Sequence, residues 1–264
     1  MSNFLTKDQI IKIAPAIYAE KPASDVSDKY VYIPSYKVIE DMEKLGWYPA
    51  EVKQSIPRNA ELDDFQKHSI RFRTEDQSLF SKVGDIIPEL YYVSSHDRSH
   101  RCMMSFALNR LVCSNGLITP VELFKSLSVR HVNIDFKAIE QVIIEIAKGF
   151  SHIYKKVEDY KTIEMTEIGK RKFAMKAHKL RWKDEKLVVP ADLLEPQREE
   201  DDKDNLWTVF NVIQENLIQG GMEYTDKNNR HRHVRPTTNI IQESKFNKEL
   251  WILMEAIRRN KNLW

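Results

Sequence analysis

The sequence predicts an α+β protein, with a mainly antiparallel sheet in the first half of the chain and helices in the second half. Between residues 30 and 132, short apolar and β-branched segments alternate with turn residues, as strands do. After residue 135 the apolar positions recur at every third or fourth residue, which is helical spacing. Strands followed by helices are typical of α+β folds.

This change of period divides the 264-residue chain into two regions. Residues 1–134 are predicted to form the α+β sheet domain, and residues 135–264 a mainly helical region that packs on it. Within the second region, residues 195–204 are predicted to be an acidic linker, because they include four consecutive acidic residues. Residues 225–236 are predicted to be a basic loop.

The first region is predicted to open with an amphipathic helix over Thr6–Glu20, which Pro15 interrupts. Thr6 and Gln9 have the spacing of a capping box at its start. A strand–helix–strand–strand unit follows, then three further strands. The unit comprises Tyr30–Ile33, a helix from Pro34 to Gly46, a strand from Trp47 and a strand at Lys67–Arg73, and the later strands are Ile86–Ser94, Arg101–Cys113 and Leu123–Val132.

The second region is predicted to contain four helices and a polar loop. Capping residues mark several of the helix ends, such as Asp135 and Asn205 at starts and Gly220 after an end. The helices are expected at residues 135–157, 166–180, 205–219 and 245–260, and the loop at Met222–Pro236.

The composition favours a globular protein without a resident cofactor. Hydrophobic residues make up 42% of the chain, no apolar run is long enough to span a membrane, and the first residues lack a signal-peptide pattern. Cys102 and Cys113 do not make a disulfide framework, so we expect buried thiols in a cytoplasmic protein. The seven glycines form no phosphate-binding loop, which argues against nucleotide hydrolysis.

The formal net charge of +2 is nearly neutral, so affinity for a nucleic acid would depend on where the cations lie. In a strand at Lys67–Arg73, Ile70 and Phe72 would face one side while Lys67, Arg71 and Arg73 face the other. Such a cationic row suits a phosphate backbone. Surface strands also carry cations for solubility alone, and both interpretations stay open.

The densest cationic segment is Lys227–Arg235, which contains no acidic residue. A basic loop of this kind can wrap phosphates, or it can be a solvated loop that balances the acidic segment before it. A third basic cluster around Trp182 has an aromatic residue among cations, which can stack on unpaired bases. A tryptophan at a helix end is more often a core residue.

The sequence His96-Asp97-Arg98-Ser99-His100 contains residue types that bind metals or transfer protons. Their spacing leaves further metal ligands undefined, and Asp97 after a strand more often forms an Asx turn. An enzyme built on His96, Asp97 and His100 is therefore the least favoured reading, and we expect no catalytic or metal site.

Six segments together resemble a known family. They are Ser27–Pro34, His68–Arg73, Ser95–Asp97, Leu111–Leu117, Asn205–Gly221 and Asn247–Trp251. In this order they resemble the phage and plasmid domain-of-unknown-function family 932, particularly its short enterobacterial members. The family has no assigned activity. Its turn after Ser95–Asp97 usually continues with glycine, whereas this chain has Arg98.

A second resemblance is shorter and concerns function. Tyr32-Ile33, Val38-Ile39 and Gly46-Trp47, followed by strands, are similar to the opening of the eukaryotic recombination mediator that anneals single strands and of its phage relatives. This resemblance implies a positively charged groove in an oligomeric ring, which holds the DNA backbone and leaves the bases outward for pairing.

These observations predict a phage or plasmid protein that binds single-stranded nucleic acid, DNA in particular, and promotes strand annealing as a homo-oligomer. The alternative is a protein that binds and blocks a host defence or restriction factor. The residues expected to contact the nucleic acid are all basic: Lys67, Arg71, Arg73, Arg98, Arg101, Lys227, Arg230, Arg232 and Arg235.

Overall fold

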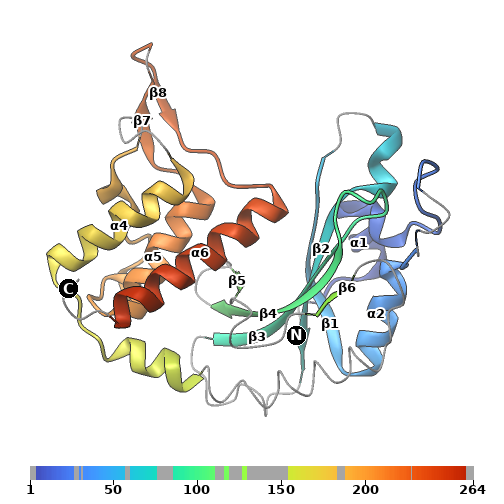
Figure 1. The fold of residues 1–264 in the computed structure, drawn as a ribbon, viewed down its shortest axis with the longest axis horizontal. Helices are drawn as coiled ribbons and strands as arrows, with labels where there is room; N and C mark the ends of the chain where they lie inside the picture. Colours follow the sequence, from blue (N-terminus) through green and yellow to red (C-terminus); the bar gives the residue numbers. More distant parts are fainter. Residues whose placement is uncertain are drawn as a thin grey trace. The chain divides into compact units, whose positions relative to one another are not determined.

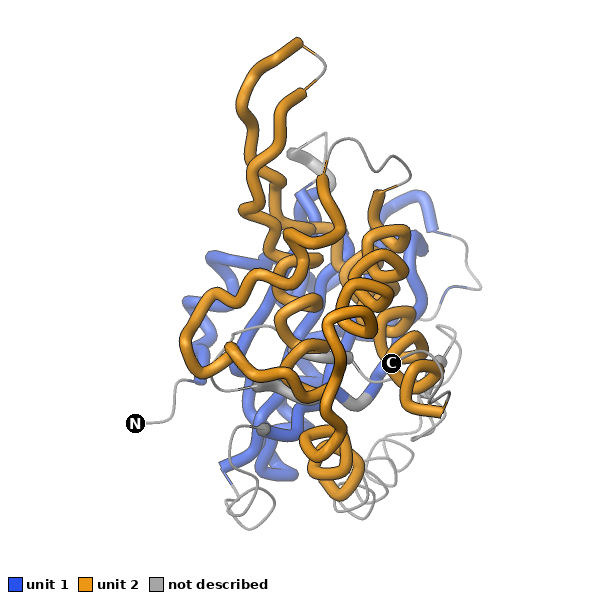
Figure 2. The backbone as a smooth tube through the Cα atoms, turned by 90° about the vertical axis from the view of Figure 1, so that its left-hand side faces the viewer, with its two compact units in different colours: residues 1–150 blue, residues 151–264 orange. Residues whose placement is uncertain are grey.

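A computed structural model describes the chain at residues 4–26, 30, 32–56, 60–75, 86–110, 116–118, 127–129, 154–182, 188–226 and 228–259. Its elements confirm the α+β prediction, with an antiparallel sheet first and mainly helices after it (Figure 1). The chain divides into two compact units, Met1–Phe150 and Ser151–Trp264 (Figure 2). Each unit is treated separately below.

The first unit contains an antiparallel sheet, in which six strands fall within the described residues. Strands β1 to β5 pair in sequence order, and β6 pairs with the part of β4 that β5 does not cover. For β2, β3 and β4, the predicted first and last residues lie close to those observed in the structure. The strands are β1 Trp47–Gln54, β2 His68–Thr74, β3 Ile86–Ser94, β4 Cys102–Arg110, β5 Gly116–Ile118 and β6 Leu127–Val129.

Helices α1 (Lys7–Ile13) and α2 (Ser35–Lys44) both contact β1. The predicted capping box is confirmed: Thr6 Oγ1 accepts from the amide of Gln9, and the Gln9 side chain accepts from the amide of Thr6. The helix predicted to continue to residue 20 ends at Ile13, and a 3-10 helix, η1 (Pro15–Tyr18), follows. Proline cannot supply the amide that would continue the α-helix.

Amphipathic spacing places α2 on the sheet. Val38, Ile39 and Met42 are buried on one face of α2, and β2 and β3 contribute Phe72 and Leu90 to the buried core. Gly46 follows the helix with φ of 77°, a left-handed conformation in which glycine is favoured. Another 3-10 helix, η2 (Ala60–Phe65), lies between β1 and β2.

The predicted strand at Tyr30–Ile33 is wrong, since its described residues have no regular secondary structure. The two tyrosines instead bind backbone carbonyls through their side chains. The Tyr30 hydroxyl donates to the Ser95 carbonyl at 3.1 Å, and the Tyr32 hydroxyl donates to the Ala19 carbonyl. Burial of this β-prone segment thus depends on aromatic side chains rather than on strand pairing.

The second unit is a group of packed helices: residues 154–161, α4 (Glu167–Arg181), α5 (Leu206–Gln219) and α6 (Ile240–Arg259). Its core includes four aromatic rings with adjacent centroids 5.7–6.5 Å apart. Burial of such rings supplies much of the stability of small helical units. The four rings are Tyr160, Trp207, Phe210 and Trp251.

The segment predicted to be an acidic linker is folded against α5. Arg198 forms ion pairs with Asp201 and with Glu215 of α5, and Asp201 is buried. A 3-10 helix, η4 (Pro190–Leu194), precedes this segment, and another, η5 (Glu199–Asp201), lies within it.

The loop predicted at Met222–Pro236 is wrong in part, because it contains an antiparallel hairpin of β7 (Glu223–Thr225) and β8 (His231–His233). This hairpin projects away from the helices of its unit (Figures 1 and 2). Helix α6 also begins earlier than predicted, where the Asn239 side chain accepts from the amides of Ile241 and Gln242. None of the described helices has the length and apolarity needed to cross a membrane.

Candidate nucleic-acid interface

The basic hairpin (β7, β8 and the turn between them) is closed by a polar turn. The Asp226 carboxylate accepts from the amide of Asn228 at 2.8 Å and from that of Arg230 at 3.0 Å. Asn229 has φ of 59°, a left-handed conformation that asparagine tolerates better than most residues. Hairpins commonly combine a short polar turn with one left-handed residue.

The Asp226 carboxylate also pairs with a cation of the basic hairpin. The hydrogen bond from the Arg230 backbone, with smaller contributions from Asn228 and Arg232, outweighs desolvation and holds the pKa of Asp226 below its usual value. Asp226 therefore stays ionised at neutral pH, where its Oδ2 lies 3.3 Å from Nε of Arg232.

The cations of the basic hairpin are exposed to solvent. Arg230, Arg232 and Arg235 are all exposed, as are His231 and His233. Tyr224 lies directly across the hairpin from Arg232, so their side chains share one face.

The base of the hairpin depends on two glycines. The amide of Gly221 donates to the Val234 carbonyl at 2.8 Å, and the amide of Val234 donates to the Met222 carbonyl at 2.9 Å. Gly220 has φ of 69°, and a Cβ atom on it would lie 2.5 Å from the Val234 carbonyl oxygen. Only glycine allows the two chain segments to approach this closely.

Arg181 joins the end of α4 to the hairpin. Its guanidinium donates to the carbonyls of Leu217 on α5 and Arg235 after β8, and burial lowers the pKa of Arg181. Its Cζ lies 4.9 Å from the ring centroid of Trp182, within the range of a cation–π contact. Cations near a helix C-terminus also offset the helix dipole, so this arrangement has a structural role as well.

These elements enclose a groove of about 770 Å³, here called the basic groove. Its wall contains three arginines, two histidines and two aromatic rings, and no carboxylate. Cations can neutralise phosphates, and partly exposed rings can stack on bases. The residues of the wall are Arg181, Trp182, Val188, Tyr224, His231, Arg232, His233, Val234 and Arg235.

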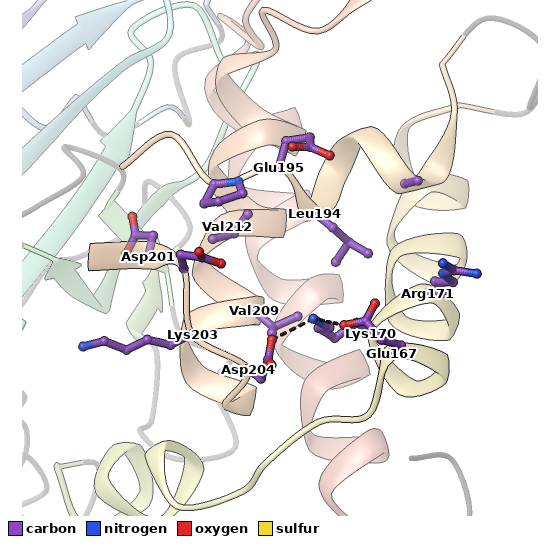
Figure 3. Close-up of a pocket in the computed structure, with 13 residues that line it drawn as sticks. Glu167, Lys170, Arg171, Leu194, Glu195, Asp201, Lys203, Asp204, Val209 and Val212 are labelled. Atoms are coloured by element: carbon purple, nitrogen blue, oxygen red, sulfur yellow. Dashed lines mark hydrogen bonds and ion pairs between the residues drawn. The ribbon is translucent and has the colours of Figure 1, made fainter. Parts of the chain in front are cut away.

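A second cavity of about 290 Å³ lies at the opposite end of α4 and is called the acidic pocket (Figure 3). Five carboxylates and three cations are among the residues around it. Lys170 is held between Glu167 and Asp204, 2.7 Å from the latter, and hydrogen bonds to Asp204 and Glu167 raise its pKa. An excess of negative charge makes the acidic pocket unsuitable for phosphates.

The predicted cationic row of β2 is not exposed. Arg71 is 3% exposed, its Nη1 lies 3.0 Å from Oε2 of Glu89, and its Nε lies 3.4 Å from Oε2 of Glu51. Arg73 Nε lies 2.6 Å from Oε1 of Glu89. The Arg71 guanidinium also stacks over the Tyr91 ring, with its Cζ 4.8 Å from the ring centroid. The alternation along β2 is as predicted, but neighbouring strands supply carboxylates that the pattern of one strand does not show.

The remaining predicted contacts of the first unit lie apart from this ion-pair cluster. Lys67 is half-buried, Arg98 is exposed and lies 3.3 Å from Asp25, and Arg101 is exposed. Lys227, predicted in the basic loop, lies outside the described residues. The structure thus brings together Arg232 and Arg235 in one groove, and Arg71 and Arg73 on one carboxylate.

The His96–His100 segment forms a turn. Asp97 Oδ1 accepts from the amide of Ser99 at 2.9 Å, as expected for an Asx turn, and hydrogen bonds from Ser99 and Ser95 outweigh desolvation and lower the Asp97 pKa. Arg98 has φ of 66°, which explains why glycine suits this position. No cluster of three potential metal ligands occurs among the described residues.

One buried arrangement in the first unit has the residue types of a nucleophile and a base. Ser35 Oγ lies 2.7 Å from Nε2 of His68, whose Nδ1 lies 2.9 Å from the Gln66 carbonyl oxygen. Ser35 and His68 are fully buried, so no substrate reaches them in this conformation. Cys102 on β4 is buried, as predicted, and desolvation raises its pKa to about 11, whereas Cys113 lies outside the described residues.

Sequence reasoning missed the place of Tyr224 in the groove. Each hairpin strand has only three residues, which is too short for alternation to be recognised. The usable signal was the Asp-Lys-Asn-Asn run at residues 226–229, because asparagine and aspartate favour turns.

Comparison with known proteins gives the family of the chain but no activity. Two Escherichia coli (strain K12) proteins, UPF0380 protein YafZ and UPF0380 protein YfjQ, are 27% and 26% identical over 254 residues. These alignments cover 96% of this chain and 91% of each relative.

No solved structure matches significantly, and the similarity to single-strand annealing proteins stays a prediction. The family model described as "Domain of unknown function (DUF932)" matches residues 22–251. Since that match covers most of the sequence, the chain belongs to the DUF932 family.

Proposed function

We propose that this protein binds single-stranded nucleic acid, DNA in particular, in the basic groove and so promotes the pairing of complementary strands. The observation that supports the proposal is the composition of the groove wall, which contains exposed cations and aromatic rings and is lined by no carboxylate. Phosphates would pair with Arg232 and Arg235, while bases would stack on Tyr224 and Trp182.

Pairing would be accelerated because bound cations lower the repulsion between two phosphate backbones. The activity needs no catalytic residue, nucleotide or cofactor. Assembly into a homo-oligomer in the cytoplasm, with Arg98 and Arg101 as further phosphate contacts, belongs to the same proposal.

The experiment is fluorescence anisotropy of a labelled single-stranded oligonucleotide, titrated at several salt concentrations with duplex as competitor. We expect salt-sensitive binding that prefers the single strand. An R232Q/R235Q variant should reduce the slope of log affinity against log salt by about 1.4, since each lost phosphate contact contributes about 0.7 on single strands.

A K245Q/K248Q variant is the matched control, because it removes two exposed lysines from α6, away from the groove wall. It should bind as the unmodified protein does. Absence of binding at low salt would overturn the proposal and make a host protein the leading partner, to be sought by pull-down after nuclease treatment.

A further inference from the structure

Helix α4 exposes three lysines on one face, here called the lysine stripe: Lys172, Lys176 and Lys179. Their spacing of four and three residues places them above one another along the helix. The opposite face of α4 is buried through Phe173 and Ala177. The lysine stripe is therefore a continuous edge of exposed positive charge.

The charge of α4 is unusually one-sided. Its fifteen residues include six lysines and arginines but one carboxylate, Glu167, which pairs with Lys170 at the beginning of the helix. Solvated helices usually mix both signs at positions four residues apart, whereas Lys172 and Lys176 repel each other at that spacing. An anionic partner would relieve this repulsion.

The lysine stripe lies on the helix whose C-terminal end forms part of the basic groove. Helix α4 ends at Arg181, and Arg181 and Trp182 form part of the groove wall. Lys172 and Trp182 are ten residues apart, which corresponds to a rise of about 15 Å along the helix. A single nucleic-acid strand that leaves the groove beside Trp182 and follows the helix would contact the three lysines one after another.

Apolar side chains accompany the lysines on this exposed surface. Met175 is 46% exposed and Ile168 is 63% exposed. Unpaired bases can contact apolar side chains while their phosphates contact lysines, whereas a duplex keeps its bases stacked inside. The combination favours a single strand over a duplex.

We propose that the single strand extends from the basic groove along the lysine stripe, from Lys179 toward Lys172. The binding site is then longer than the groove, and α4 adds affinity only for strands long enough to reach it. This inference rests on the proposed function of the groove.

The test compares a K172Q/K176Q variant with the unmodified protein on oligonucleotides of about 4 and about 16 nucleotides, the usual range of single-strand sites. We expect unchanged binding of the short strand. The long strand should bind on the order of tenfold more weakly at 0.1 M salt, with a salt slope reduced by about 1.4. The K245Q/K248Q variant, which also removes two exposed lysines, should match the unmodified protein on both strands.

Two results would overturn the inference: undiminished binding of the long strand by K172Q/K176Q, or an equal loss on both lengths. The proposed function would survive either result, since it fails only if the unmodified protein binds neither oligonucleotide at low salt. Circular dichroism of K172Q/K176Q should show unchanged helix content, because both side chains are exposed and their removal reduces repulsion.

Discussion

Strand β2 and the basic hairpin both carry arginines at alternate positions, yet these arginines lie in opposite environments. Arg71 is buried against Glu89 and Glu51, whereas Arg230 and Arg232 are exposed. The difference arises from the neighbours: β2 is flanked by two strands that supply carboxylates, while β8 pairs with one short strand. Cations inside a sheet are neutralised by the fold, and cations on a projecting hairpin stay accessible to an external anion.

The largest expected effect comes from removing Glu89, the carboxylate of β3 that pairs with both arginines of β2. An E89Q variant leaves two guanidiniums without their shared buried partner, so the free energy of unfolding should fall by about 3–5 kcal/mol. Urea denaturation measures the change. The corresponding removal of charge in the hairpin, R232Q, should change stability by less than about 0.5 kcal/mol, as exposed substitutions do. Equal losses in the two variants would contradict the comparison.

A smaller effect is expected on binding in the hairpin. A Y224A variant should weaken binding of a single-stranded oligonucleotide by about 1–3 kcal/mol, because a stacking surface for one base is lost. Y224F retains the ring and should bind normally in the same anisotropy titration. If Y224F lost as much affinity as Y224A, the hydroxyl rather than the ring would be responsible.

Asp226 provides a third test, in which a hairpin cation is freed from its carboxylate. D226N keeps a hydrogen-bond acceptor for the turn but no longer attracts Arg232, so the salt slope of binding should steepen by up to about 0.7. Unchanged salt dependence would mean that Arg232 does not contact phosphate.

The sign of the pH effect follows from the lowered pKa of Asp226. Its contribution to stability is complete above the unfolded value of about 3.9 and is lost as the pH falls through the folded pKa. Stability curves of the unmodified protein and D226N should therefore converge only in acid.

The smallest effect is expected at Arg98, an exposed cation of the first unit. Its left-handed backbone costs about 1–2 kcal/mol, which R98G would relieve, while the flexibility of glycine in the unfolded chain offsets about 0.5–1 kcal/mol. Loss of the exposed Asp25 pair costs up to about 1 kcal/mol more, so the net change in thermal stability should be close to zero. R98A loses the same pair but keeps the backbone strain, so it should be less stable than R98G.

The strands and helices that the sequence predicts well have strong local signals. β2 and β3 are rich in β-branched and aromatic residues, the Thr6 capping box marks α1, and Asn205 caps α5, whose apolar face is continuous. These are properties of neighbouring residues. The strand prediction at Tyr30–Ile33 failed because the structure there depends on distant residues. The hydroxyls of the two tyrosines donate hydrogen bonds to the carbonyls of Ser95 and Ala19, which a local sequence pattern does not show.

The candidate site is partly predictable for the same reason. Arg232 and Arg235 belong to a dense local cluster, which the sequence displays directly. Glu89 lies eighteen residues from Arg71, so its neutralising role depends on the register of β2 against β3. Likewise, Arg181 reaches the hairpin only because α4 and α5 pack together.

Gly220 has a consequence for how this family can diversify. Any side chain at this position would collide with the Val234 carbonyl, so no single substitution preserves the present hairpin base. A substitution of Gly220 would require a different backbone conformation in the connection between α5 and β7. Members of the family that have another residue at this position should therefore differ in the conformation of the whole basic hairpin. The residue at this one position would then distinguish the members that have this hairpin from those that do not.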